Sequence, residues 1–208
     1  MSDNKALTWV RSMRIIALLL CLTLLITPTV HASLLHLDPE ATHVAFTLGG
    51  NMHSVEGMLN LVQGEIQFDP VNGQVSGKIV LDATSARTEN KKRDRKMHET
   101  VLESPTYPEM VFVPNRLEGE FHAEGTSHVR LLGTLSIHGA DHPLEIPATI
   151  ITTAGTLSGS ATLTIPYVEW GMQDPSFFIF RVEKTVSIML DIAGSLVPDP
   201  GVASGAAR

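Results

Sequence analysis

The histidines of this chain are residues whose type and spacing could support metal binding. The chain has 9 histidines, and His138 and His142 bracket a short stretch of small and acidic residues. Neutral imidazole is a common zinc and copper ligand. Residues four apart share a face on a helix, but Gly139 and Pro143 favour a turn here, where that rule does not apply. We therefore expect no resident metal and keep a periplasmic metal-binding protein, using surface histidines, as the alternative function.

The sequence contains no recognisable catalytic motif. Ser54 stands beside His53, but neighbouring residues in a strand point to opposite faces. There is no nucleophile elbow, phosphate-binding loop or HExxH motif. The only cysteine, Cys21, lies in the apolar segment near the N-terminus. We predict that the protein is not an enzyme and has no cofactor.

The charge balance argues against two classes of electrostatic partner. The chain has 15 basic and 22 acidic residues, so its formal net charge is −7 with neutral histidines. Three of those basic residues and one acidic residue precede residue 33, which leaves a net charge of −9 for the rest of the chain. A surface of this sign repels nucleic acid and anionic lipid headgroups. We expect neither as an electrostatic partner.

The N-terminal 32 residues have the features of a signal peptide. Lys5, Arg11 and Arg14 precede an apolar run over residues 15–26, and small residues follow at 30–32. A run of this length is well below the roughly 20 residues that a membrane-spanning helix needs. We predict a signal peptide at 1–32, one domain at 33–196 and a flexible tail at 197–208. The mature protein is then periplasmic or secreted, without stable membrane insertion.

Most of the remaining chain alternates between apolar and polar residues, as β-strands do. Clear examples cover residues 44–48, 144–150, 157–165 and 186–192. A turn at 69–73, which contains Asn72 and Gly73, joins two more strands into a hairpin. About eight antiparallel strands remove their edges by closing into a barrel. We predict an all-β, eight-stranded antiparallel barrel, with a two-sheet sandwich as its competitor.

Residues 91–104 form the one segment with a helical pattern. Thr88 or Asn90 is a suitable N-cap, and the helix is expected to end before Pro105. A narrow apolar stripe contains Met97, Val101 and Leu102. So thin a stripe does not anchor a core, so we expect the helix to cover one opening of the barrel as a lid.

Three motifs stand out in the helix and the segments after it: Arg93-Asp94 at the start of the helix, Tyr107-Pro108 before a strand with Phe112, and GTLSIHG at 133–139 followed by HPL at 142–144. With these motifs the chain resembles the YceI-like family of secreted, lipocalin-like, polyisoprenoid-binding proteins. The resemblance covers most of residues 34–195. It implies a lipocalin-like barrel that accepts an isoprenoid chain or isoprenoid quinone without catalysis.

A hydrophobic guest needs an apolar lining, for which the sequence offers candidates. Burying one methylene contributes about 0.8 kcal/mol, so an apolar interior binds a chain without strong polar contacts. We expect such a lining, although every barrel also needs apolar residues simply to fill its core. The predicted lining residues are Phe46, Met58, Met97, Phe112 and Leu135.

Two further residues have more than one interpretation. Arg93 either pairs with a diphosphate headgroup at the barrel mouth or fastens the helix to the rim. Trp170 either contacts ligand or packs under the second barrel opening. The prediction is a carrier or sequestering protein for a hydrophobic small molecule, monomeric or weakly dimeric.

Overall fold

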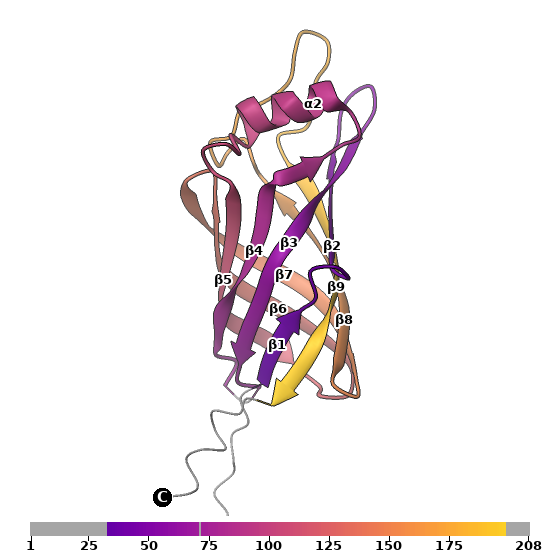
Figure 1. Ribbon diagram of the computed structural model, residues 1–208, viewed down its shortest axis with the longest axis vertical. Coiled ribbons are helices and arrows are strands. Elements are labelled where there is room, and N and C mark those ends of the chain that lie inside the picture. Colours follow the sequence, from indigo (N-terminus) through magenta and orange to yellow (C-terminus); the bar gives the residue numbers. More distant parts are fainter. Residues whose placement is uncertain (1–32, 71, 199–208) are drawn as a thin grey trace, which may run out of the picture. The chain divides into compact units, whose positions relative to one another are not determined.

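The computed structural model describes residues 33–70 and 72–198 as a barrel of antiparallel strands with one short helical segment (Figure 1). The predicted signal peptide and residues 199–208 of the predicted tail lie outside these ranges. The last strand continues to Pro198, two residues into the predicted tail. The strands are β1 (Ser33–Leu37), β2 (His43–Leu48), β3 (Val55–Phe68), β4 (Val75–Arg87), β5 (Glu109–Glu120), β6 (Gly125–Ile137), β7 (Ala140–Thr153), β8 (Thr156–Ile165) and β9 (Val186–Pro198).

The nine strands occupy eight positions around the barrel. β1 and β2 share one position between β3 and β9: β1 pairs with residues 64–68 of β3 and 194–198 of β9, and β2 with residues 55–59 and 187–191. All the other strands pair with their sequence neighbours, and β3 also pairs with β4. The sheet therefore closes without a free edge. The predicted eight-stranded antiparallel barrel is confirmed, and the sandwich alternative is excluded.

Short turns connect several of these strands. Two residues, His138 and Gly139, join β6 to β7 with φ angles of 52° and 77°. Ala154 and Gly155 join β7 to β8 with φ angles of 49° and 77°. Positive φ at both central residues is the pattern of a type I′ turn, whose twist matches that of the flanking strands. Such turns fix the register and thus decide which side chains face inward.

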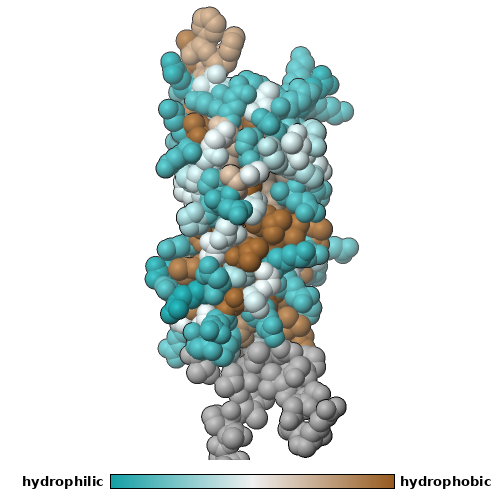
Figure 2. All heavy atoms as spheres, turned by 90° about the vertical axis from the view of Figure 1, so that its left-hand side faces the viewer, coloured by the Kyte–Doolittle hydropathy of each residue, from teal (hydrophilic) through white to brown (hydrophobic). Residues whose placement is uncertain are grey.

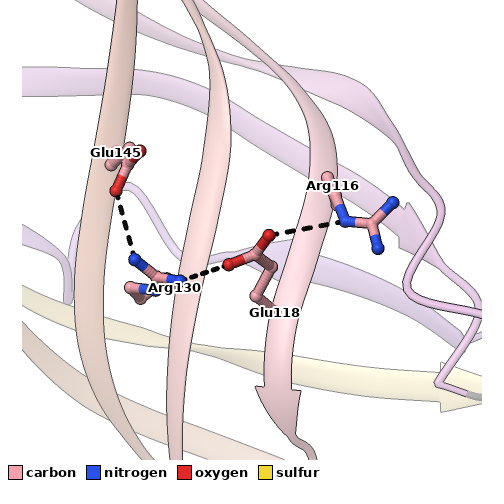
Figure 3. Close-up of polar contacts among 4 residues, drawn as sticks. All are labelled: Arg116, Glu118, Arg130 and Glu145. Atoms are coloured by element: carbon pink, nitrogen blue, oxygen red, sulfur yellow. Dashed lines mark hydrogen bonds and ion pairs between the residues drawn. The ribbon is translucent and has the colours of Figure 1, made fainter.

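A row of ion pairs crosses the outer face of β5, β6 and β7 (Figure 3). Arg116 Nε lies 3.6 Å from Glu118 Oε1, and Arg130 bonds the second oxygen of Glu118. Arg130 also lies 3.5 Å from Glu145 Oε2. Exposed pairs of this kind contribute about 0–1 kcal/mol each. They mark the solvent side of these strands, opposite the apolar interior.

The barrel interior is filled with side chains at the end where β1 begins and β9 ends. Phe68 and Phe121 meet there edge to face, with their ring centroids 4.8 Å apart. Two clusters of buried side chains complete this zone, and they include Ile66, Val75, Val129, Ile150 and Leu157. Hydrophobic packing thus closes this end of the barrel, and any internal space must lie toward the other end.

The helical segment lies across that other end (Figure 1). It consists of α2 (Lys91–Lys96) and a π-helical turn, η2 (Met97–Val101). The N-cap is Asn90, whose side-chain oxygen accepts hydrogen bonds from the backbone N–H groups of Lys92 and Arg93. The predicted helix over one opening is therefore confirmed. No helix within the described ranges has the length and apolar character needed to cross a membrane.

Candidate functional site: an apolar cavity beneath the helix

A cavity of about 670 Å³ lies inside the barrel, below the helical segment. Ligand pockets in proteins usually measure roughly 300–1,000 Å³, so the space is sufficient for a small molecule. The inward faces of the strands form its wall, and helical residues and the β8–β9 connection form its upper boundary. The site is therefore a lidded chamber inside the barrel.

The wall of the cavity follows the period-two pattern of the strands. Along β9 the lining residues are every second side chain from Val186 to Ile192, and along β2 they are those from Val44 to Leu48. Alternate side chains of a strand point to the same face, so these apolar residues face inward together. The inward faces predicted for both segments are confirmed.

The apolar stripe of the helical segment forms the roof. Met97, Val101 and Leu102 all line the cavity. His98 holds this roof in place, since its Nε2 lies 2.8 Å from the carbonyl oxygen of Ala86 in β4 and its Nδ1 lies 2.8 Å from Ser104 Oγ. A carbonyl accepts only, so Nε2 carries the hydrogen and donates to Ala86. The roof is fastened to the wall through this side chain.

Arg93 and Asp94 both bind Thr88, a buried residue between β4 and α2. The guanidinium group of Arg93 donates to Thr88 Oγ1 and to its carbonyl oxygen, each at 2.7 Å. Asp94 Oδ1 accepts from the backbone N–H of Thr88 at 2.9 Å and from its hydroxyl group. These contacts fasten the start of the helix to the end of β4. Arg93 also lines the cavity, so its position retains access to the interior.

The charged residues at the cavity are all basic. Lys92, Arg93 and Lys96 belong to its boundary, and no aspartate or glutamate does within the described residues. Lys96 Nζ donates to the carbonyl oxygen of Pro175 at 3.2 Å, which connects α2 to the β8–β9 connection. The chamber is thus apolar along its length and positive at the helix end. This arrangement suits an amphiphile whose apolar chain lies inside and whose polar head lies at the helix.

The β8–β9 connection contributes a part of the boundary that sequence patterns do not reveal. Tyr167, Met172, Pro175 and Val182 all line the cavity. The Tyr167 hydroxyl donates to the carbonyl oxygen of Glu183 at 2.9 Å, and burial, with the nearby charge of Asp174, raises the pKa of Tyr167 to about 12. A loop has no repeating period, so only its apolar composition hinted at these contacts.

Comparison with known proteins agrees with this architecture. Residues 35–193 match the family model of the YceI-like domain. The chain belongs to the YceI-like family. None of the curated proteins matches the chain.

Solved structures show the same fold at low sequence identity. BcnA of Burkholderia cenocepacia is 18% identical and superposes with a TM-score of 0.64, over 76% of this chain and 98% of BcnA. A domain from Saccharophagus degradans, described as polyisoprenoid-binding and implicated in plant cell wall breakdown, is 14% identical. It superposes with a TM-score of 0.61 over 77% of this chain and 97% of that domain. At such identities the likeness establishes the shared fold.

Two of the motifs that resemble the YceI-like family meet at one corner of the barrel rim. The rings of Tyr107 and His138 lie 5.0 Å apart between centroids. A side chain at Gly139 would come within 2.6 Å of Tyr107 Cε1, so the tyrosine ring packs against this turn. The motifs therefore shape the rim near the roof.

The barrel brings together five of the seven predicted site residues. Phe46, Arg93, Met97, Phe112 and Leu135 all line the cavity. Phe112 and Leu135 are also members of a buried core cluster, so they serve packing as well.

Met58 does not line the cavity, in contrast to the expectation from sequence. Its side chain is 48% exposed on the outer face of β3, where Arg87 Nη2 lies 3.0 Å from its sulfur. Its chain neighbour Leu59 faces inward instead and lines the cavity. Adjacent residues of a strand point to opposite faces, so the inward position of Leu59 places Met58 outside.

Trp170 and the two candidate metal ligands, His138 and His142, lie outside the cavity lining. The indole of Trp170 stacks on the ring of His142, with centroids 4.1 Å apart and an interplanar angle of 5°, outside the cavity lining. His138 instead contacts Tyr107, and its Nε2 lies 3.6 Å from Glu103. The β8–β9 connection that contains Trp170 is at the helix end, joined there through Lys96, rather than at a second opening. Residues 33–70 and 72–198 contain no group of three or more His, Cys, Asp or Glu that could hold a metal.

Proposed function

We propose that this YceI-like protein binds a hydrophobic small molecule in its barrel and carries or sequesters it without chemical change. The observation that supports the proposal is the 670 Å³ chamber, whose wall is apolar from β2 round to β9. Each methylene moved from water into such a chamber contributes about 0.8 kcal/mol, so a chain of a few isoprene units is held by burial alone. An isoprenoid lipid or isoprenoid quinone is the proposed guest.

The charges at the helix end suggest how such a guest is oriented. Lys92, Arg93 and Lys96 supply hydrogen-bond donors and positive charge, and within residues 33–70 and 72–198 no aspartate or glutamate lines the boundary. Oxygen-rich or anionic headgroups interact favourably with such a cluster. The proposed orientation places the head beneath α2 and the chain toward the packed end of the barrel.

Particular residues have distinct roles in this proposal. Phe46, Met97, Phe112 and Leu135 contact the chain, and the flexible thioether of Met97 adapts to an irregular guest. Arg93 has a double role, since it binds Thr88 and also faces the headgroup position. Met58 and Trp170 have no place in the proposed site.

We place this function in the periplasm or outside the cell, after removal of residues 1–32, with the barrel acting as a monomer or weak dimer. The likeness to a domain described as polyisoprenoid-binding supports the ligand class.

The measurement that tests the ligand is native mass spectrometry of protein purified from its own host, followed by lipid extraction. We expect an added mass that extracts as a prenyl lipid or quinone. A protein that is empty and also takes up neither added quinones nor prenyl lipids contradicts the proposal. The same spectra give the N-terminus and the oligomeric state.

A further inference from the structure

The β8–β9 connection ends in an apolar tip that projects beyond the barrel. Four consecutive residues, Phe177, Phe178, Ile179 and Phe180, form this tip, and their exposures run from 53% to 82%. In Figure 1 the connection rises above α2, and in Figure 2 a group of hydrophobic side chains protrudes from that end of the surface. Single exposed apolar residues are ordinary, but a contiguous exposed group indicates an interaction site.

The tip has a defined structure. Phe177 and Phe180 exchange two backbone hydrogen bonds of 2.9 Å, so residues 178 and 179 form a two-residue hairpin turn. The rings of Phe177 and Phe178 meet at 63°, with their centroids 5.1 Å apart. The side chain of Asn51 donates to the carbonyl oxygen of Ile179 at 2.8 Å and accepts from the N–H of Arg181 at 3.0 Å. The hairpin is thereby fixed to the β2–β3 connection.

The first central residue of this turn has an unusual backbone conformation for its type. Phe178 has a φ of 55°, a region that favours glycine or asparagine over an aromatic residue. Its side chain is 82% exposed, so packing within the described residues does not compensate for the strain. Phe178 thus combines an unfavourable backbone conformation with an exposed apolar side chain. Such a combination indicates that the residue has a role other than stabilising the fold.

The tip belongs to the same connection that bounds the cavity. Pro175 and Val182, on either side of the tip, both line the chamber. Lys96 of the roof bonds the carbonyl oxygen of Pro175. A partner that binds the tip is therefore brought to the roofed end of the chamber.

We propose that the tip of residues 177–180 inserts into the surface of a phospholipid bilayer and docks the roofed end of the barrel there. A protruding point with three aromatic side chains matches the membrane interface, which accepts aromatic and apolar groups at the level of the headgroups. Met52, 66% exposed on the connection to which the tip is bonded, adds apolar surface. The proposal concerns docking alone, so the tip can fail as an anchor while the cavity still binds its guest.

The charge of the molecule determines what kind of contact this is. The flanks of the tip carry both signs, with Arg181 and Lys184 opposed by Asp174 and Glu183. The formal net charge of the whole chain is −7, so attraction to anionic lipid does not drive the contact. Apolar insertion is insensitive to salt and does not require anionic lipid. The protein is therefore expected to bind neutral phosphatidylcholine vesicles at least as well as phosphatidylglycerol vesicles.

The first test compares vesicle binding of the full chain with that of two variants that have the same N-terminus, as checked by intact mass. Phe178→Gly with Ile179→Ser removes the two central and most exposed apolar side chains of the tip, and glycine suits the positive φ at position 178 better. We expect sedimentation with phosphatidylcholine vesicles to weaken by at least about tenfold, with a thermal midpoint that does not fall. Ile151→Thr, which removes an exposed apolar side chain from β7, should bind like the original protein. Equal sedimentation of the original and tip variants, or none by the original, overturns the proposal.

A second measurement places the contact. An environment-sensitive dye on Ile179→Cys should shift to the blue on addition of vesicles, while the same dye on Ile151→Cys should not, both in a chain in which Cys21 is changed to Ser. Similar behaviour of the two positions overturns the assignment to the tip. Self-association without vesicle binding, abolished by Phe178→Gly with Ile179→Ser, would identify the tip as a contact between two copies and would also overturn the proposal.

Discussion

His98 donates a hydrogen bond of 2.8 Å from its Nε2 to the carbonyl oxygen of Ala86, and this contact joins the cavity roof to β4. The roof itself is short, with six α-helical and five π-helical residues. A helix of this length is not stable in isolation. Contacts to the barrel must hold it, and His98 and Arg93 provide them on either side of Met97.

Replacing His98 should therefore loosen the roof. His98→Leu leaves the Ala86 carbonyl and the buried Ser104 without their partner, which should lower the free energy of unfolding by about 1–3 kcal/mol. Release of a bound fluorescent prenyl lipid should become faster. Urea titration and stopped-flow release measure the two effects. Glu99→Gln, an exposed change on the same segment, is the control and should change neither.

Met97 and Met58 form a matched pair for testing the cavity wall. Met97→Asp places a charge in the apolar chamber and should weaken prenyl-lipid affinity by at least about tenfold. Met58→Asp makes the same change on the outer face and should leave affinity within about twofold, because that side chain already contacts solvent. Fluorescence titration with a labelled prenyl lipid gives both affinities. If both variants bind alike, the guest does not lie beneath the roof.

Substitution of charged residues on α2 can distinguish a contact with the ligand headgroup from an effect of general surface charge. Lys92→Gln with Lys96→Gln removes two charges from the cavity boundary, whereas Lys91→Gln with Arg95→Gln removes two from the same helix outside it. We expect the first pair to weaken binding of a prenyl phosphate by about threefold to tenfold and to spare a neutral quinone. The second pair should have little effect on either ligand. Equal losses from the two pairs would mean that the headgroup lies elsewhere.

The raised pKa of Tyr167 predicts that the folded protein loses stability at high pH. Its pKa is raised to about 12 in the folded barrel, above the value near 10 of an unburied tyrosine, so the folded state favours the protonated form. This contribution is fully present below pH 10 and is lost as the pH rises through 12. Tyr167→Phe should abolish that part of the pH dependence and, through the lost hydrogen bond to Glu183, cost about 0.5–1.5 kcal/mol at neutral pH. Chemical denaturation of both proteins between pH 7 and pH 12 measures the difference. A pH dependence that is the same in both proteins would assign the alkaline loss to other groups.

The sequence predicts the wall of the cavity well wherever a strand is regular. In β9 and β2 the apolar alternation identifies the inward residues correctly, because one face must meet the interior and the other must meet water. The stripe of Met97, Val101 and Leu102 is identified for the same reason on a helical period.

The course of β3 explains why counting every second residue wrongly places Met58 on the inward face. Ile66 and Phe68 face inward near the end of the strand, and counting back in steps of two reaches Met58. The pairing of β3 with β4 shifts register between Leu61 and Gln63, so the inward side changes to Leu59 and Leu61. An extra residue at a β-bulge reverses the inward and outward order on one side of it. The only local sign of this bulge is the switch of the apolar residues from odd positions to even positions along β3, and the choice of Met58 overlooked it.

By itself, the sequence determined the strand-rich class, the single helical segment and its apolar stripe, because periodicity and turn chemistry are local properties of the chain. Closure into a barrel, rather than a two-sheet sandwich, came from the pairing of β1 and β2 with β9 at the far end of the chain. The tertiary structure alone decided that one end of the barrel is packed and the other hollow, and that the β8–β9 connection joins the roof through Lys96 and Pro175. These features arise from contacts between residues far apart along the chain, and local patterns carry no record of such contacts.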